Sequence, residues 1–381
     1  MITRIKSENI IVKDAIISGY VYFEDDKIIY VGNEERKFDK EINAGENYVS
    51  PGFIDLHTHG AVAGDYCAPK SKEEVLRALR YQNEHGATTI YPTLSACTFE
   101  QAISTLEIMR EAMEANPSAN VPGIHIEGPF FAVNQKGGQN AEYLTDADPD
   151  YYLPITEKYG DIISRWDYAP ERDKDSKFGK FLKDKGITAS IAHSDAEYED
   201  VVRAIGDGVE LVTHLYSCTS TITRRSGFRI LGVTECAYLF DELNCELICD
   251  GKHLPPPLLK MIFKTKPHDK LILVTDSIPA AGMGGTGTEV NVLGINAVIE
   301  DGVCKLVDRS AFCGSIATAD ILIKVAVTEG GLEITDAVRM LTENPAKLMK
   351  LNKGTLAEGY DADFVIFDKN FNVIKTIVMG K

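Results

Sequence analysis

The chain has 381 residues, of which 44% are hydrophobic and 25% are charged, and this composition excludes a disordered or low-complexity protein. Its 57 acidic residues outnumber its 40 basic residues, so the formal net charge is -17. A surface this acidic repels nucleic acid and anionic lipid, and we expect neither as a partner. A substrate that carries phosphate would need a local basic cluster.

No stretch approaches 18 uninterrupted apolar residues, and the N-terminal segment lacks the apolar core of a secretory signal. The 8 cysteines are scattered along the chain and form no C-x-x-C motif, which favours free thiols in a reducing compartment. We therefore expect a cytoplasmic protein without a membrane span.

Both ends of the chain read as short strands. The stretches IIVKDAI, GYVYFEDDKIIYVG and NYVSPG within the first fifty residues partly alternate apolar and polar residues, and Asp25 and Asp26 break the runs. The stretches DADFVIFD and FNVIKTIVMGK at the other end have the same character. Two β-rich ends therefore flank a long middle of a different kind.

The middle alternates predicted strands and helices. Ser71 with Glu74, and Thr98 with Gln101, match capping boxes that open helices, and Gly86 is a plausible end of the first helix. The eight candidate strands lie at 53–57, 87–93, 123–128, 163–170, 187–194, 210–216, 245–251 and 270–277. Short apolar strands separated by helices predict a (β/α)₈ barrel, with an open eight-stranded sheet as the alternative.

Several of these strands end in residues that bind metals. The first leads into His57-Thr58-His59, whose two imidazoles point to the same side of a strand. The third, fifth, sixth and eighth strands end in Glu127, His193, His214 and Asp276. Because active sites of such barrels lie at the carboxyl ends of the strands, these residues are predicted to converge on a metal site.

Each of these residues alone also has an ordinary explanation. Glu127 could form a salt bridge or cap a helix, His193 could be a core histidine beside an N-cap, and Asp276 could belong to a turn. The combination favours the metal site. His85 and His268 lie outside the pattern, and we interpret them as surface or packing residues.

With these residues in place, the chain resembles the amidohydrolase superfamily and, more narrowly, the N-acetylglucosamine-6-phosphate deacetylases. The matching stretches are PGFIDLHTHG, GIHIEGPF, AHSDA, THLYS, DGKH, LVTDSIPAAG, CGSIATAD, ENPAK and GTLAEGYDADFVIFD. The HIEGPF stretch followed by Lys136-Gly137 is specific to the deacetylase branch, whereas H-x-H and GxDADxV mark only the superfamily.

The resemblance implies a TIM-like (β/α)₈ barrel at 51–353 and a small β-sandwich domain formed by 1–50 and 354–381. It also implies hydrolysis of the acetamido group of N-acetyl-D-glucosamine 6-phosphate to acetate and D-glucosamine 6-phosphate, as a step of amino-sugar catabolism. Members of the family are commonly homodimers.

The resemblance further assigns roles to the polar residues. Glu127, His193 and His214 match the principal metal ligands, and His57 and His59 would complete a second position that Glu127 bridges. The expected cofactor is one or two divalent ions, most simply zinc, with iron or another transition metal as alternatives. Asp276 matches the catalytic aspartate, which takes a proton from water and then gives it to the leaving amine.

Arg225 and His253 match the residues that bind the substrate phosphate in the family. Arginine suits phosphate because its guanidinium binds two oxygens at once. The alternative for the run of Arg224, Arg225 and Arg229 is a solvated loop or inter-subunit salt bridges, and in a dimer one subunit's arginine could reach the other's site. Backbone N–H groups near Ser217 and Cys218 are further candidates for contacting the sugar phosphate.

Gln139 marks a departure from the family, because many members have a histidine here that orients the acetyl carbonyl. We expect Gln139 to contact the substrate, although its amide donates a hydrogen bond without carrying charge. The departure leaves the sugar preference open, and N-acetylgalactosamine 6-phosphate or a related N-acetyl sugar is the alternative substrate.

Other functional classes fit less well. A dihydroorotase-like or D-aminoacylase-like amidohydrolase usually has a carboxylated lysine at a strand end, whereas Glu127 takes that position here. A non-catalytic scaffold would be expected to lose ligands or the base, and all of them are present. The glycine-rich run at 281–287 is no P-loop because no G-K-[ST] ends it, and we interpret it as a loop near the mouth of the barrel.

Overall fold

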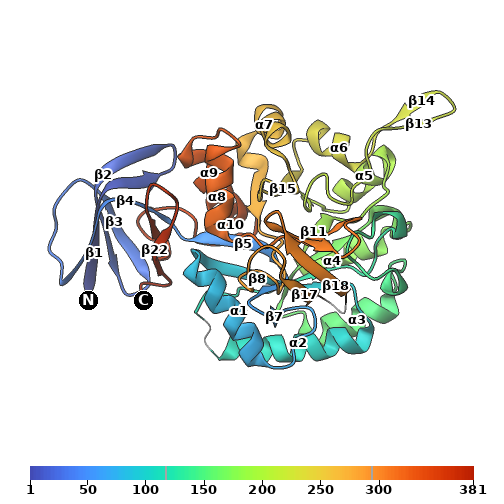
Figure 1. Ribbon diagram of the computed structural model, residues 1–381, viewed down its shortest axis with the longest axis horizontal. Coiled ribbons are helices and arrows are strands. Elements are labelled where there is room, and N and C mark those ends of the chain that lie inside the picture. The colour runs from blue at the N-terminus through green and yellow to red at the C-terminus, as the bar shows by residue number, and fades with distance from the viewer. Residues whose placement is uncertain (116–117, 293–294) are drawn as a thin grey trace.

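The structure is a computed structural model of the chain, and it describes residues 1–115, 118–292 and 295–381. A sheet built from both ends of the chain lies beside a larger barrel that is covered by helices (Figure 1). The two termini lie close together in the sheet. Within the described ranges, no helix is long and apolar enough to cross a membrane.

The barrel is an eight-stranded parallel sheet in the order β16-β15-β12-β11-β10-β9-β8-β5. Its strands are β5 (Phe53–Thr58), β8 (Ala87–Ser95), β9 (Ile124–Glu127), β10 (Ile163–Tyr168), β11 (Thr188–Ile191), β12 (Leu211–Val212), β15 (Asn244–Ile248) and β16 (Leu271–Val274). The seam between β16 and β5 closes just beyond the end of β16, where Asp276 N donates to His57 O at 2.9 Å and His59 N donates to Ser277 O at 2.6 Å. The barrel is therefore the predicted fold, and the open sheet is excluded.

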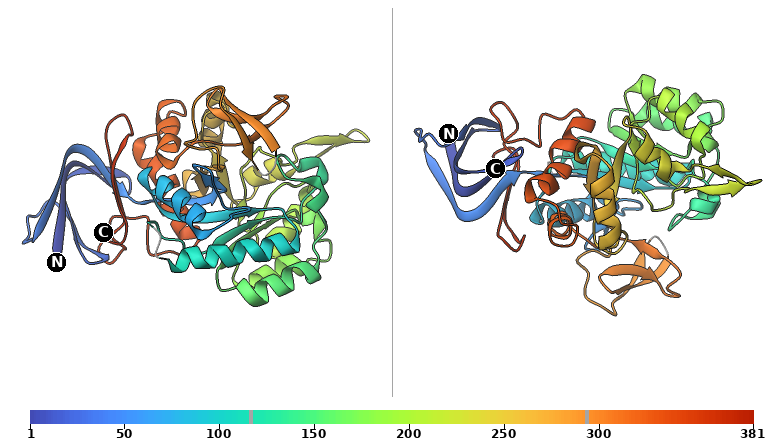
Figure 2. Two further views of the ribbon diagram at one scale, coloured as in Figure 1. Left: turned by 60° about the horizontal axis from the view of Figure 1, so that its bottom comes forward. Right: turned by 90° about the horizontal axis from the view of Figure 1, so that it is seen from above.

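Helices cover the outside of the barrel (Figure 2), because each turns an apolar stripe toward the strands. The α-helices are α1 (Lys72–Glu84), α2 (Phe99–Glu114), α3 (Pro149–Tyr159), α4 (Lys177–Lys185), α5 (Tyr198–Gly206), α6 (Val233–Leu239), α7 (Pro256–Thr265), α8 (Ala319–Thr328), α9 (Ile334–Met340) and α10 (Glu343–Leu348). Short 3₁₀ helices lie at Val133–Gln135, Ala141–Tyr143, Pro170–Arg172 and His268–Lys270.

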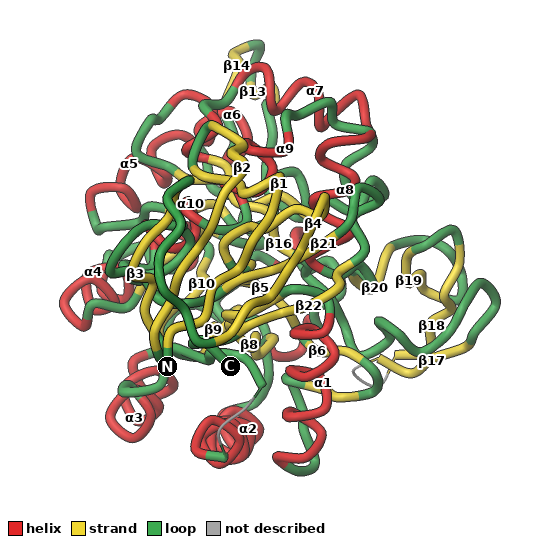
Figure 3. The backbone as a smooth tube through the Cα atoms, turned by 90° about the vertical axis from the view of Figure 1, so that its left-hand side faces the viewer, coloured by secondary structure: helices red, strands yellow, loops and turns green. Residues whose placement is uncertain are grey.

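The terminal sheet has six strands in the order β22-β21-β4-β1-β2-β3 (Figure 3). They are β1 (Ile2–Val12), β2 (Ala15–Glu24), β3 (Lys27–Gly32), β4 (Lys40–Pro51), β21 (Phe364–Phe367) and β22 (Val373–Ile377). β1 pairs with β4 in parallel and with β2 antiparallel. The sheet has a core of its own, in which the rings of Phe23 and Phe364 lie 5.2 Å apart.

Two insertions extend from the barrel. The hairpin of β13 (Thr223–Arg225) and β14 (Phe228–Ile230) projects from the body at the upper right of Figure 1. A four-stranded antiparallel sheet projects elsewhere, drawn orange in Figure 2. Its strands are β17 (Glu289–Val292), β18 (Ile295–Glu300), β19 (Val303–Leu306) and β20 (Phe312–Gly314), and a further small pair is β6 (Gly60–Ala61) with β7 (Gly64–Asp65). The sequence analysis predicted none of these strands.

All eight barrel strands lie where they were predicted, but six end earlier than expected, and for three of them this places a metal-binding residue beyond the strand. β11, β12 and β16 end two residues before His193, His214 and Asp276. These three residues have the left-handed φ values 45°, 29° and 46°, a conformation that a strand cannot contain. The metal-binding side chains therefore lie in the turns after the strands.

Two smaller expectations were wrong. The stretch IIVKDAI is split by a turn at Lys13, whose φ is 47°. Ser71 precedes α1, but its side chain caps nothing, whereas Thr98 accepts a hydrogen bond from Gln101 N at 3.2 Å. The capping-box patterns therefore predicted both helix starts, but only the cap contact of Thr98 is present.

A charged layer fills the barrel interior below the mouth. Arg165 on β10 is fully buried, and its guanidinium lies 3.0 Å from both Asp167 Oδ1 and Glu246 Oε2. Burial raises the pKa of the Asp167 carboxyl, but the adjacent Arg165 charge outweighs burial and holds that pKa well below its usual range. Buried charges persist only when they are paired and hydrogen-bonded, so this cation holds two carboxylates in place beneath the site.

Replacement of Arg165 with leucine tests this role. The variant leaves two buried carboxylates without their cation, and we expect the free energy of unfolding to fall by about 3–5 kcal/mol. Denaturant titration of wild type and variant measures the change. The matched control is Arg110→Leu, which removes a surface pair with Asp161 and should cost at most about 1 kcal/mol. Equal losses in the two variants would contradict the role of the buried layer.

Candidate functional site

A buried carboxylate is the centre of the site. Glu127 ends β9, and its Oε1 atom lies 3.0 Å from His193 Nε2 and 3.1 Å from His214 Nε2. The exposed fractions of the three residues are 2%, 5% and 3%. The sequence thus predicted correctly that these side chains, which are far apart in the chain, lie together.

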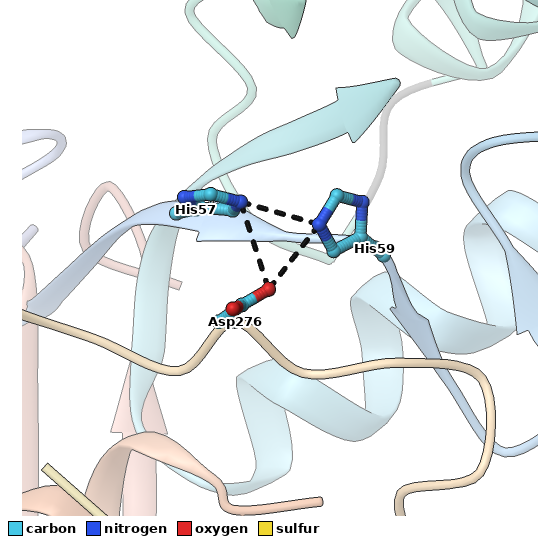
Figure 4. A group of neighbouring side chains, drawn as sticks. All are labelled: His57, His59 and Asp276. Carbon is cyan, nitrogen blue, oxygen red and sulfur yellow. Dashed lines mark hydrogen bonds and ion pairs between the residues drawn. The ribbon is translucent and has the colours of Figure 1, made fainter. Parts of the chain in front are cut away.

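A second donor group lies beside the first. His57 Nε2 and His59 Nε2 are 3.2 Å apart, and Asp276 Oδ1 lies 3.6 Å from the former and 3.2 Å from the latter (Figure 4). The Oε2 atom of Glu127 is 3.5 Å from His59 Nε2. Its Oε1 atom, which contacts the first group, also lies 3.6 Å from His57 Nε2, so Glu127 faces both groups.

The donor sets fit divalent cations. In each group the candidate ligand atoms lie within 4.8 Å of one another, and buried imidazoles with a carboxylate are the ligands that zinc and related ions prefer. A third group, of His57, His125 and Asp167, meets the same distance criterion. Arg165 already supplies a cation there, with its Nε atom 3.0 Å from Asp167, so we assign no ion to it.

Contacts at the Nδ1 atoms of the imidazoles orient the rings. His193 Nδ1 lies 2.7 Å from Gln135 O, and His214 Nδ1 lies 3.1 Å from Ser217 O. His57 Nδ1 lies 3.5 Å from Glu246 Oε2. A hydrogen donated from Nδ1 leaves the Nε2 lone pair for a metal, so the rings of His193 and His214 present their Nε2 atoms to the site.

Attraction between the imidazoles and the carboxylates of the site shifts their pKa values. Burial lowers the pKa of His193, but hydrogen bonds and charge at Cys218 and Glu127 raise it well above its ordinary value. Burial raises the pKa of Asp276, but the neighbouring charges of His57 and His59 outweigh burial and hold it well below its usual range. The Asp276 carboxyl is therefore ionised at neutral pH, as a proton acceptor must be.

A cavity of about 250 Å³ opens onto both donor groups. Of the residues predicted to contact substrate, Gln139, Ser217, Cys218 and His253 line it. His253 Nδ1 lies 2.7 Å from Asp250 Oδ2, and its ring contacts Phe312 edge-on with centroids 5.0 Å apart. These four residues therefore lie where the sequence placed them.

Arg225 lies elsewhere. It is on the projecting β13–β14 hairpin, pairs with Glu197, and has a side chain that is 67% exposed. Among the described residues that line the cavity, Arg225 is absent. A role for this arginine in the site of its own subunit has no support in the geometry.

Several residues that support the site were missed by sequence reasoning. Arg165, Asp167 and Glu246 lie inside predicted strands, and charged residues in buried strands were a signal that could have identified them. Cys67 and Ser95 contact His59 Nδ1 at 3.4 Å and 3.2 Å, and nothing in the sequence indicates these contacts. His85 and His268 pair with Asp320 and Asp336 away from the site, in line with their predicted packing roles.

Comparison with known proteins assigns the family. A profile of the amidohydrolase family matches residues 48–381. The chain belongs to the amidohydrolase family. It is 31% identical to the N-acetylglucosamine-6-phosphate deacetylase of Bacillus subtilis over 98% of this chain and 97% of that protein, and 28% identical to the Homo sapiens protein of the same name over 97% and 91%.

Solved structures of relatives of this amidohydrolase have the same fold. An N-acetyl-D-glucosamine-6-phosphate deacetylase mutant from Mycobacterium smegmatis, in complex with N-acetyl-D-glucosamine-6-phosphate, superposes with a TM-score of 0.91 at 25% identity, covering 100% of this chain and 98% of that one. The deacetylase from Thermotoga maritima gives 0.88 at 27% identity, covering 100% and 99%. The predicted resemblance and fold class are confirmed.

The site predicts proton-linked metal binding. Because burial lowers the pKa of His214 but Glu127 raises it above its ordinary value, and His193 is raised as well, both imidazoles hold protons near pH 6.5 in the cation-free protein. Zinc needs their lone pairs, so its affinity should rise as the pH increases above the ordinary pKa of histidine, about 6.5. Calorimetry in two buffers of different ionisation enthalpy measures the protons released. A heat independent of buffer and pH would contradict the prediction.

Proposed function

We propose that this protein hydrolyses the acetamido group of N-acetyl-D-glucosamine 6-phosphate, giving D-glucosamine 6-phosphate and acetate, as a step in amino-sugar catabolism. One observation carries the proposal. Glu127 faces two buried donor groups at once, and one of them contains the ionised carboxylate of Asp276. Full-length similarity to N-acetylglucosamine-6-phosphate deacetylases supports the choice of substrate.

In this proposal, one set of residues binds metal and Asp276 transfers a proton. Glu127, His193 and His214 would hold one divalent ion, and His57 and His59 a second. A bound divalent ion supplies Lewis acidity, which polarises the amide carbonyl and makes water more acidic. Asp276 accepts a proton from the attacking water and then donates it to the amide nitrogen, so that the nitrogen leaves as an amine.

The residues that line the cavity support the proposed contacts with the sugar phosphate. His253 and the segment at Ser217 and Cys218 line the cavity together with Asp276, and we assign the sugar phosphate to His253. Asp250 holds the ring of His253 through Nδ1 at 2.7 Å, which leaves Nε2 as the atom that would face a phosphate oxygen.

We assign Arg225 to the neighbouring subunit's site in a homodimer. The hairpin that carries it projects from the body (Figure 1); Phe228 on it is 75% exposed and Ile222, just before it, is 50% exposed, which suits a surface that another subunit covers. We further propose zinc as the metal, the cytoplasm as the location, and 1–50 with 354–381 as one domain beside a catalytic domain at 51–353. The free thiols of all eight cysteines suit a reducing compartment.

The alternative substrate is N-acetylgalactosamine 6-phosphate or a related N-acetyl sugar. The epimers differ in one hydroxyl group, and Gln139 stands where the family's histidine contacts the acetyl group. A substrate panel therefore decides between them.

Asp276→Asn tests the base. The amide cannot accept the proton, so we expect acetate release to fall by about 10²–10⁴-fold. Zinc content by elemental analysis should show that the first ion, held by Glu127, His193 and His214, is retained. A wild-type protein that releases no acetate with any divalent metal would overturn the proposed function.

Removal of the substrate phosphate tests the assignment of His253. Hydrogen bonds to charged groups contribute about 1.5–3 kcal/mol, so kcat/KM should fall about 10–100-fold for N-acetylglucosamine relative to its 6-phosphate. The His253→Ala variant should lose most of this preference, and Arg225→Ala should lower it too. His85→Ala, remote from the cavity, is the control. Equal activity on both sugars would refute the phosphate contacts and leave the deacetylase chemistry standing.

A further inference from the structure

Gln139 is engaged at both ends of its amide. Its Oε1 atom accepts a hydrogen bond from Ala96 N at 3.0 Å, and its Nε2 atom donates to Glu127 Oε2 at 2.6 Å. The residue is only 8% exposed. Because an ionised carboxylate accepts hydrogen bonds and cannot donate them, the amide has only this orientation. The side chain was predicted to contact substrate, yet its polar atoms are occupied by the protein.

The two oxygens of Glu127 are held differently. His193 and His214 both contact Oε1, which His57 Nε2 approaches to 3.6 Å, whereas Oε2 is 3.5 Å from His59 Nε2. Within the described ranges, the amide of Gln139 makes the one hydrogen bond to Oε2. Rotation about the terminal bond of a glutamate is broad, so contacts at Oε1 alone leave the direction of Oε2 weakly fixed.

The loop that carries Gln139 is itself anchored to the site. Gln139 N donates to Lys136 O at 2.9 Å, and Ala132 N donates to His193 O at 2.9 Å. Gly137 has a φ of 54°, and a Cβ atom there would lie 2.6 Å from Cys218 Sγ. The loop therefore passes close over the site, and Ala96 ties Gln139 to the segment after β8.

We propose that Gln139 is a positioning residue that fixes Glu127 Oε2 toward the group of His57, His59 and Asp276, and thereby sets the affinity of the second cation. The inference rests on the proposed metal-dependent deacetylase function. Outer contacts to metal ligands typically change metal affinity by 10–100-fold. Loss of the amide should therefore weaken the second ion by about that factor and leave the first ion, held through Oε1, nearly unchanged.

Zinc titration of the metal-free protein, by calorimetry and by zinc content after dialysis, tests the inference. Gln139→Leu removes the donor, and Gln139→Asn keeps the polarity but is one methylene too short to reach both partners. Gln101→Leu is the matched control, because Gln101 lies in the wall of a neighbouring cavity and its amide contacts Thr105 at 3.0 Å. Thermal unfolding of the metal-free variants verifies that each is folded.

We expect wild type and Gln101→Leu to bind two equivalents of zinc, with the second about 10–100-fold weaker in both Gln139 variants. Two equivalents with wild-type affinities in either folded Gln139 variant would overturn the inference. So would a wild-type enzyme that takes up a single zinc ion with full acetate release, although that result would leave the proposed function intact.

Discussion

The structure depends on one buried anion that must be compensated. Glu127 is 2% exposed, and an ionised carboxylate at such a depth is tolerated only with several partners. Imidazoles from the ends of β11 and β12 and from the segment after β5 supply them, together with the amide of Gln139. The ends of distant strands are thus held in register by a single side chain, and the same contacts create the cation site.

The charged layer beneath explains why this arrangement persists in the barrel interior. Arg165 pairs with both Asp167 and Glu246, and Glu246 in turn faces His57 Nδ1 at 3.5 Å. Burial lowers the pKa of His125 to about 4, and the charge of Arg165 contributes to that shift. His125 therefore stays neutral at the pH where His193 is charged. Arg165 thus compensates carboxylates below the site, and Glu127 and Asp276 above it are left to the imidazoles and to any divalent ion that the site binds.

Much of the fold was accessible from the sequence because apolar runs and helix signals repeat locally. The residues at strand ends were accessible too, since parallel strands place their carboxyl ends together. The β17–β20 sheet and the β13–β14 hairpin were missed because they are short and partly exposed, so they carry little periodic pattern. The contacts of Gln139 and Cys67 depend on side-chain packing between distant segments, and no local pattern encodes such packing.

The strained turns after β11, β12 and β16 carry residues of the candidate site. His193, His214 and Asp276 have positive φ values without being glycine, and each such conformation costs about 1–3 kcal/mol. The turn lifts each side chain out of the alternation of its strand and directs it into the mouth. Contacts such as His193 Nδ1 with Gln135 O at 2.7 Å offset part of that cost. Since the strain occurs at three strand ends whose side chains belong to the two donor groups, a cation bound there would stabilise the same strained turns.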